Sequence, residues 1–266
     1  MKEYKDLVKQ VLACGEVKEC RNGVTTSLIG TQLKFDAANI PLLNGRKIFY
    51  KGVVGEFSAF MNNCDNISQF KKRGCNYWDA WADDFGYLWL DYVDQLHSKQ
   101  IVNGDLDYIT QLEALKIGLV NDKFSRRHII NLWRPNNLHN LSLPCCHYSY
   151  QFIVSVDNKL NMIWTQRSAD VMVGIPSDMI LAYLWVQCLS KELGFKPGEV
   201  TMNFGDTHIY EEHITGAKQY LEVLEPRLIP IATLNDKFTC IEQFYPDQID
   251  IIQYDPHPAI KFELKV

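Results

Sequence analysis

The sequence predicts an α+β fold that forms one domain over residues 1–266, and three features support this expectation. Segments with helical spacing and segments with strand-like alternation both occur along the chain. With 266 residues and 47% hydrophobic composition, the chain is long enough to bury one large core. It contains no internal repeat, low-complexity segment or linker that would divide it.

The order of the predicted elements follows from the spacing of their apolar residues. Helical spacing predicts helices at residues 1–14, 48–61 and 177–193. Alternating or β-rich runs predict strands at residues 25–35, 147–156, 159–168, 199–204 and 249–254. Ser177 or Asp178 is expected to cap the start of the last helix, and Gly194 to end it. The aromatic-rich segment 66–97 is compatible with a pocket wall and with an ordinary aromatic core.

Composition and charge exclude several classes of protein. The net charge of −5 argues against a broad nucleic-acid-binding surface, although it allows a local cationic pocket. The chain has no apolar run of about 18 residues, and its charged N-terminus lacks the apolar core of a signal peptide. We therefore expect a soluble, cytoplasmic protein with no membrane partner. The eight cysteines form no CxxC pair, so we expect neither a zinc site nor a disulfide scaffold, and no metal.

Two segments contain a candidate nucleophile and a candidate anion site. Cys146 directly precedes His147, and a cysteine so placed can act as a nucleophile with a lowered pKa, although such neighbours also occur by chance. The run Gln166-Arg167-Ser168-Ala169-Asp170 places a guanidinium beside a hydroxyl, which suits an oxyanion such as phosphate. Taken by itself, this run is explained more simply as a solvated strand end.

Two further pairs of polar residues are candidate ligand contacts. Arg126 and Arg127 are adjacent, which fits either a solvated loop or an anion clamp. His208 and Tyr210 are two residues apart, so on a strand they would face the same side and could contact one ligand hydroxyl. Each pair has an ordinary structural explanation. The order of all four segments along the chain is more specific than any one of them.

Taken together, these segments resemble the thymidylate synthase family, and the resemblance covers residues 1–266. The residues that carry it are Arg21-Asn22-Gly23, Glu56, Trp78-Asp79-Ala80-Trp81-Ala82-Asp83, Arg126-Arg127-His128, Leu143-Pro144-Cys145-Cys146-His147, Gln166-Arg167-Ser168-Ala169-Asp170, Gly174-Ile175-Pro176, Gly205-Asp206-Thr207-His208-Ile209-Tyr210 and Tyr254-Asp255-Pro256-His257-Pro258. The resemblance implies a mixed, twisted β-sheet packed by helices, and a homodimer formed sheet to sheet. It also implies one-carbon transfer from 5,10-methylenetetrahydrofolate to carbon 5 of a pyrimidine nucleoside monophosphate.

The same resemblance implies the catalytic roles. Cys146 would bond covalently to carbon 6 of the pyrimidine, which makes carbon 5 nucleophilic. Arg167 would lie beside the thiolate and lower its pKa. Glu56 would organise proton transfer around the base, and Tyr92 aligns with a tyrosine implicated in removing the proton from carbon 5. Cys145 stands where the family has proline.

Binding roles follow from the resemblance as well. The implied substrate-binding residues are Arg21, Arg126, Arg127, Gln166, Ser168, Asp178, His208 and Tyr210. Arg126 and Arg127 would reach the phosphate across the interface of a homodimer, and His208 and Tyr210 would hold the sugar 3′-hydroxyl. The implied folate-binding residues are Trp78, Trp81, Leu143, Asp170, Gly174 and Val266.

Asp178 is the sharpest departure from the family, which has an asparagine there that faces the edge of uracil. An ionised aspartate cannot donate to oxygen 4 of uracil. It can accept from the amino group of cytosine and from a protonated ring nitrogen 3. Aspartate here resembles the deoxycytidylate (dCMP) hydroxymethylase branch, known from viruses that modify their cytosine. We therefore predict conversion of dCMP to 5-hydroxymethyl-dCMP, and the simpler alternative is that Asp178 only caps a helix.

Three other functions remain open at this point. Trp78 and Leu143 are shared with the synthases, which favours a dCMP 5-methyltransferase that forms 5-methyl-dCMP and dihydrofolate. An ordinary thymidylate synthase that converts dUMP to dTMP is a second alternative. The third is a nucleotide- or RNA-binding protein without catalysis, but binding alone does not require the thiol of Cys146.

Overall fold

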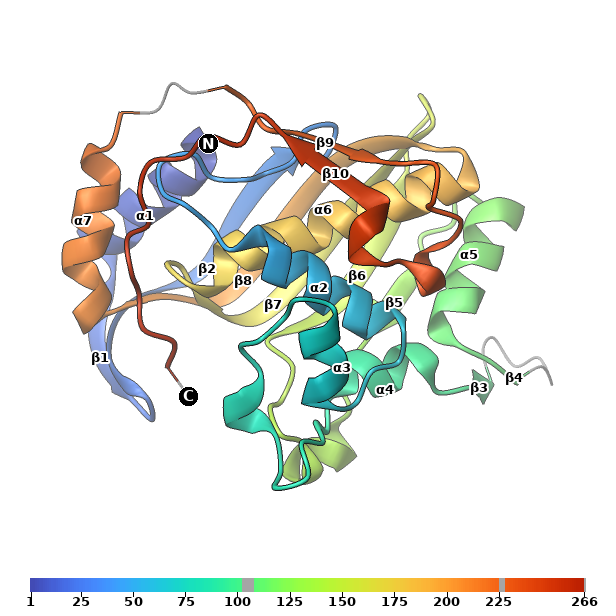
Figure 1. Cartoon of the computed structure of the whole chain (residues 1–266), viewed down its shortest axis with the longest axis horizontal. Helices are drawn as coiled ribbons and strands as arrows, with labels where there is room; N and C mark the ends of the chain where they lie inside the picture. The colour runs from blue at the N-terminus through green and yellow to red at the C-terminus, as the bar shows by residue number, and fades with distance from the viewer. Residues whose placement is uncertain (102–107, 225–227, 266) are drawn as a thin grey trace.

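The structure is a computed structural model that describes residues 1–101, 108–224 and 228–265. Its main element is a twisted sheet with the strand order β1-β2-β8-β7-β6-β5 (Figure 1). These strands are β1 (Glu16–Cys20), β2 (Gly23–Asp36), β5 (Ile129–Asn131), β6 (His147–Val154), β7 (Lys159–Asp170) and β8 (Lys196–Tyr210). β7 and β8 are parallel and the other neighbouring strands are antiparallel, so the sheet is mixed. The predicted α+β fold is confirmed.

Helices pack against the sheet and around its edges. They are α1 (Lys2–Cys14), α2 (Tyr50–Met61), α3 (Ile67–Lys72), α4 (Asp91–His97), α5 (Gln111–Asn121), α6 (Gly174–Leu193) and α7 (Ile214–Glu222). Two small ribbons pair β3 (Gln100–Ile101) with β4 (Tyr108–Ile109), and β9 (Ile231–Leu234) with β10 (Ile249–Ile252). In Figure 1, α2 and α6 lie in front of the sheet, while α1 and α7 pack together at one end. No helix in the described ranges is long and apolar enough to cross a membrane.

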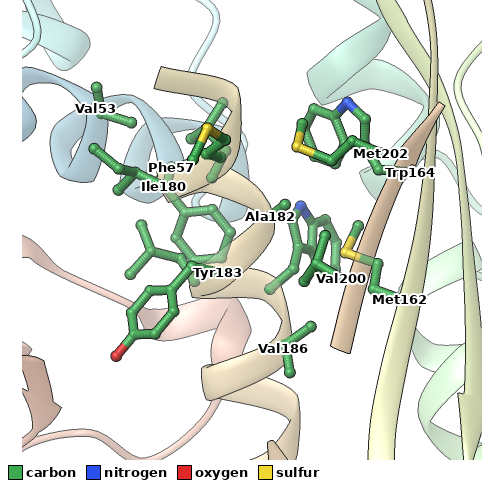
Figure 2. Packing of buried hydrophobic residues seen from close by; sticks show 14 of the residues in the cluster. Val53, Phe57, Met162, Trp164, Ile180, Ala182, Tyr183, Val186, Val200 and Met202 are labelled. Carbon is green, nitrogen blue, oxygen red and sulfur yellow. The ribbon is translucent and has the colours of Figure 1, made fainter. Parts of the chain in front are cut away.

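α6 is the central helix of the core. It makes the crossover that parallel strands require, between β7 and β8. Fourteen of its twenty residues are buried, as expected for a helix that is apolar on all sides. Figure 2 shows Ile180 of α6 near Val53 of α2, while Trp164 and Met202 lie on the sheet side. The core therefore fills the layer between α2 and the sheet.

Most predicted elements are confirmed, but the expected start of α6 is wrong. This helix begins at Gly174, so Ser177 and Asp178 lie inside it and neither is its N-cap. Pro176 does not prevent the earlier start, because the first N–H groups of a helix have no intrahelical partner. The carboxylate of Asp170 accepts hydrogen bonds from the N–H groups of Met172 and Val173 and so supports the preceding turn. Gly194 ends the helix as predicted, with a left-handed φ of 77°.

Two predicted strands have different ends in the structure. The strand expected at 199–204 is the centre of the much longer β8, which includes His208 and Tyr210. The strand expected at 249–254 stops at Ile252, because Gln253 has a positive φ of 59°. Segment 66–97 contributes both to a pocket wall and to the aromatic core, the two roles considered for it. Trp78 is buried in the core and also lines a cavity, whereas Phe85 is 83% exposed.

Gly55 allows α2 to approach the segment that follows α3. A Cβ atom at this position would lie 2.3 Å from the carbonyl oxygen of Arg73. We therefore expect Gly55→Ala to lower the free energy of unfolding by about 1–3 kcal/mol, as overpacking typically does. Chemical denaturation measures this, with Lys51→Ala, at an exposed position of the same helix, as the control. Equal stability of the two variants would contradict the close packing.

Candidate active site

A cavity of about 1280 Å³ opens beside the first turns of α6. Its walls come from the β1–β2 turn, α2, the ends of β7 and β8, and the C-terminal segment. The predicted site residues that line it are Arg21, Glu56, Trp78, Trp81, Tyr92, Leu143, Cys146, Gln166, Arg167, Ser168, Asp170, Gly174, Asp178, His208 and Tyr210. Arg126 and Arg127 are exposed and do not line it, and Val266 lies outside the described residues.

Cys146 lies directly before β6, in a loop that Arg167 and Tyr92 support. The Arg167 side chain donates 2.9 Å hydrogen bonds to the carbonyl oxygens of Cys145 and Pro144. Its guanidinium also lies 4.0 Å from the Cys146 sulfur. The backbone N–H of Cys146 donates to the hydroxyl oxygen of Tyr92 at 2.6 Å. The thiol is therefore held beside a cation and a phenol at the wall of the cavity.

The electrostatics of Cys146 differ from the simplest expectation. Burial raises the pKa of its thiol, and the nearby carboxylate of Asp178 adds to that effect, while Arg167 and Tyr92 lower the pKa. The neighbouring His147 does not supply a positive charge. Its ring lies between those of Tyr92 and Trp164, and burial lowers its pKa to about 3, so it is neutral. Arg167 is thus the cation that favours the thiolate.

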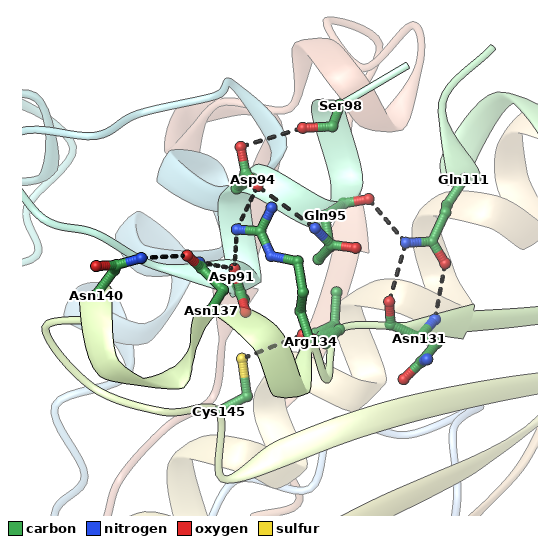
Figure 3. A network of polar contacts seen from close by, with 11 residues as sticks. Asp91, Asp94, Gln95, Ser98, Gln111, Asn131, Arg134, Asn137, Asn140 and Cys145 are labelled. Atoms are coloured by element: carbon green, nitrogen blue, oxygen red, sulfur yellow. Dashed lines mark hydrogen bonds and ion pairs between the residues drawn. The ribbon is translucent and has the colours of Figure 1, made fainter. Parts of the chain in front are cut away.

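A polar network behind the loop connects α4 to the segment before Cys146 (Figure 3). Arg134 bonds to Asp91 at 2.5 Å and to Asp94 at 2.7 Å, and the amide of Asn137 also donates to Asp91. Asp91 is buried and begins α4, so this network positions the next residue, Tyr92. A buried carboxylate needs such partners to offset its lost hydration.

Cys145 is buried and lies near this network (Figure 3). Its sulfur lies 3.9 Å from the carbonyl oxygen of Leu132, in the layer beneath the loop. Burial raises the pKa of this thiol well above its ordinary value. Cys145 therefore behaves as a small apolar residue of the core, in contrast to the adjacent Cys146.

Glu56 is a buried carboxyl group whose two oxygens both accept hydrogen bonds. It lies on α2 and is 6% exposed. Tyr77 donates to one oxygen at 2.8 Å, and the indole N–H of Trp78 donates to the other at 2.7 Å. Burial raises the pKa of Glu56 to about 7, although both hydrogen bonds act to lower it. Glu56 can therefore exchange a proton near neutral pH.

Asp178 is a second buried carboxyl group in the same cavity. It lies in the second turn of α6, is 8% exposed, and accepts a 2.9 Å hydrogen bond from the side-chain amide of Gln166. Burial raises the pKa of Asp178 to about 7, while that hydrogen bond lowers it. Its other oxygen, Oδ1, has no hydrogen-bond partner among the described residues. That oxygen is available to a ligand.

Arg21, Arg167 and Ser168 are three of the basic and hydroxyl-bearing residues that line the cavity, and they come from two separate parts of the same sheet. Arg21 lies in the exposed turn between β1 and β2, and Arg167 and Ser168 lie near the end of β7. Together they can bind an anion through a guanidinium and a hydroxyl group. The negative net charge of the chain does not prevent this, because the cations are local.

His208 is oriented by a residue that the sequence reasoning did not single out. Asp206 accepts a 2.9 Å hydrogen bond from Nδ1 of His208, and Ser27 and Lys18 also donate to it. These partners hold the pKa of Asp206 well below its usual range. Because Nδ1 is used, Nε2 of His208 is left to contact a ligand. The ring of Tyr210 lies beside it, 5.1 Å between centroids.

The C-terminal segment closes one side of the cavity. Phe262 lies under the guanidinium of Arg46, 4.9 Å from it, and the carbonyl of Glu263 accepts from His213 at 3.0 Å. Lys265 forms an ion pair with Glu212. These contacts place the tail over the end of β8. Within the described residues, no group of three or more His, Cys, Asp or Glu side chains is arranged to hold a metal ion.

Sequence reasoning missed Tyr77, Asp206 and Trp164 as supporting residues. Tyr77 and Trp164 are ordinary aromatic residues in the sequence, and nothing in their spacing indicates that they donate to polar side chains of the site. Asp206 lies within the run Gly205 to Tyr210 that was noted for His208. Its alternation with His208 on one strand was a signal that could have paired them.

Removing the positive charge of Arg167 should make Cys146 less reactive. We expect Arg167→Gln to raise the thiol pKa and slow alkylation of Cys146 by iodoacetamide about tenfold, the change in thiolate that one pKa unit produces. Peptide mass spectrometry follows the rate, with the exposed Cys14 as an internal control. Arg167→Lys should retain part of the effect. An unchanged rate in Arg167→Gln would show that this guanidinium does not act on the thiol.

Comparison with known families agrees with this geometry. The model of the family described as Thymidylate synthase matches residues 2–266, almost the entire chain. Members of this family are transferases that move a one-carbon unit from methylenetetrahydrofolate to carbon 5 of a pyrimidine nucleotide. The cavity contains the Cys146 thiol beside the Arg167 guanidinium, together with two buried carboxyl groups, and this combination is suited to that chemistry. The chain belongs to the thymidylate synthase family.

Proposed function

We propose that the protein converts dCMP to 5-hydroxymethyl-dCMP, with 5,10-methylenetetrahydrofolate as co-substrate. The observation that carries the choice of cytosine is Asp178, a carboxyl group that lies in the same cavity as Cys146. The alternative role as an N-cap is excluded, because Asp178 lies inside α6. Because Asp178 does not cap the helix and its carboxyl group is buried, it is well suited to recognise a ligand.

The hydrogen-bonding capacity of Asp178 decides which base is favoured. An ionised carboxylate only accepts, so it pairs with the amino group of cytosine and with a protonated ring nitrogen 3. Uracil presents a carbonyl oxygen in place of the amino group, which leaves two acceptors facing each other. Each unsatisfied buried group costs about 1–3 kcal/mol, so two mismatches would favour dCMP by on the order of a hundredfold.

The side chains of the cavity can perform the covalent steps on the pyrimidine. The Cys146 thiolate adds to carbon 6, and carbon 5 becomes electron-rich as a result. A proton on ring nitrogen 3, held by Asp178, makes carbon 6 more electrophilic. Glu56 has a pKa of about 7, so it can donate and accept protons around the ring. We assign Tyr92 a part in removing the carbon 5 proton. Burial raises the pKa of its hydroxyl, which is therefore neutral and passes a proton on as it accepts one. Its oxygen also contacts the backbone of Cys146.

The walls of the cavity fit a folate. Trp78, Trp81 and Leu143 provide an apolar surface for a pteridine ring, while Asp170 ends β7 and Gly174 begins α6. The carboxylate of Asp170 already accepts two backbone hydrogen bonds through one oxygen, so the other can contact the ligand. When bound, methylenetetrahydrofolate supplies the one-carbon unit. We retain Val266 as a proposed contact by family resemblance.

We further propose a homodimer in which Arg126 and Arg127 bind the phosphate of the neighbouring subunit. Both side chains are exposed and lie outside the cavity lining of their own subunit. Arg21, Arg167 and Ser168 would complete the phosphate site, and His208 and Tyr210 would hold the sugar. Contribution from a second copy explains how these arginines can act at a cavity that they do not reach within one subunit.

A methyltransferase is the second candidate, and specific residues favour it. Trp78 and Leu143 add largely apolar side chains to the cavity wall, which favours a site that keeps water away from the one-carbon unit. A methyl product requires that water be kept away, whereas a hydroxymethyl product requires that water reach the one-carbon unit. Ser177, a polar residue that lines the cavity beside Asp178, favours the hydroxymethyl product because it can hold a water there.

The choice of base can be measured directly. We expect wild-type protein to turn over dCMP with a kcat/KM about a hundredfold above that for dUMP, for the reason given above. Asp178→Asn should reverse the order, because an amide can both accept and donate. Asp157→Asn, in the exposed β6–β7 turn, is the matched control and should retain dCMP preference. A wild-type enzyme that strongly prefers dUMP would overturn the proposal.

The product of the dCMP reaction separates the two candidate activities. We expect the mass of 5-hydroxymethyl-dCMP and no dihydrofolate, because water rather than hydride completes the one-carbon unit. Mass spectrometry identifies the product, and absorbance follows dihydrofolate. Formation of dihydrofolate in step with a product of methyl mass would establish the methyltransferase instead. Cys146→Ala should abolish both products, which excludes a contaminating activity.

A further inference from the structure

Trp164 is a donor-only side chain that lies behind the base-recognition residues. Its indole N–H donates to Oε1 of Gln166 at 2.9 Å. Trp164, on β7, is fully buried in the core (Figure 2). It does not line the cavity, so it has no direct access to a nucleotide. Indole nitrogen cannot accept a hydrogen bond. The contact therefore determines which end of the Gln166 amide faces Trp164.

The orientation of the Gln166 amide determines whether Asp178 receives a hydrogen bond from an N–H group. With Oε1 directed at Trp164, the amide nitrogen donates to the carbonyl of Ser168 and to Oδ2 of Asp178, each at 2.9 Å. A flipped amide would oppose its N–H groups to the indole N–H and its oxygen to two acceptors. All three contacts thus favour one orientation, and Gln166 is only 3% exposed, so a cavity water is a poor substitute for them.

We propose that Trp164 is a specificity-positioning residue: by fixing the Gln166 amide, it makes Asp178 present hydrogen-bond acceptors to the base and thereby excludes uracil. This inference rests on the proposed preference for dCMP. A donated N–H favours the ionised form of Asp178. The neutral acid would resemble an amide, because it could donate to oxygen 4 of uracil while accepting from nitrogen 3.

The groups that face Asp178 act in opposite directions on its charge. Burial and the nearby carboxyl groups of Glu56 and Asp170 raise its pKa, and Gln166 is the group that lowers it. The thiol of Cys146 and the hydroxyl of Tyr150 also interact electrostatically with Asp178. Above about pH 7 the carboxylate is ionised and uracil is rejected; below that pH the neutral form tolerates uracil. The ratio of kcat/KM for dCMP to that for dUMP should therefore rise with pH through this region.

The test compares Trp164→Phe with wild-type protein across that pH range. Phenylalanine keeps an aromatic ring against His147 and Tyr150 but removes the donor. We expect the dCMP to dUMP ratio to fall about tenfold, as for one lost polar contact, and its pH midpoint to move upward. Trp185→Phe, a buried indole on α6 that also contacts Tyr150, is the matched control and should retain the wild-type ratio.

A second variant guards against misfolding of Trp164→Phe. Gln166→Met removes the donated N–H itself and should lower the ratio in the same way. If the dCMP to dUMP ratio and its pH midpoint were unchanged in both variants, the inference would be overturned. It would also be overturned if only Gln166→Met changed them, because Trp164 would then have no part in the discrimination. A wild-type enzyme without dCMP preference would instead refute the proposed function. Equilibrium binding of dCMP and dUMP, without folate, should show the same loss of discrimination.

Discussion

The burial of α6 between the sheet and α2 is the constraint on which the rest of the structure depends. Because this helix is apolar around its circumference, it has to be covered on all sides, and its first turns end up beside the ends of β7 and β8. Asp178 occurs in these turns, so the packing of the core brings a carboxyl group into the cavity. α2 forms the other side of the same layer and brings Glu56 to that cavity. The packing of α6 between α2 and the sheet therefore determines where the site forms.

Desolvation is the dominant electrostatic effect in this site. It raises the pKa of Glu56 and Asp178 to about 7, raises that of Cys146, and makes His147 neutral. The protein offsets part of this effect with specific donors: Tyr77 and Trp78 for Glu56, Gln166 for Asp178, and Arg167 for Cys146. Burial without these donors would favour neutral side chains throughout. The combination keeps Glu56 and Asp178 close to a change of charge near neutral pH, where proton transfer is most effective.

Much of the fold and of the site could be predicted from local pattern. The spacing of apolar residues located α1, α2, β6 and β7, since their periods follow directly from backbone geometry. Element ends were less predictable: α6 starts earlier than expected because Asp170 supports the preceding turn through contacts beyond the local pattern. The pairing of Cys146 with His147 was also misleading. The imidazole is buried among aromatic rings and is neutral, so it provides no cation for the adjacent thiol.

The sequence alone determined that the protein is an α+β protein of the thymidylate synthase type with Cys146 as its expected nucleophile, because the residue types and their order are local information. It also identified Asp178 as the unusual residue. Only the tertiary structure decided the surroundings of these groups. Trp164, Gln166 and Asp178 come together across β7 and α6, and Arg134 supports Tyr92 from a distant loop. Hydrogen-bond orientation and desolvation depend on such contacts between distant segments, and no local pattern in the chain specifies them.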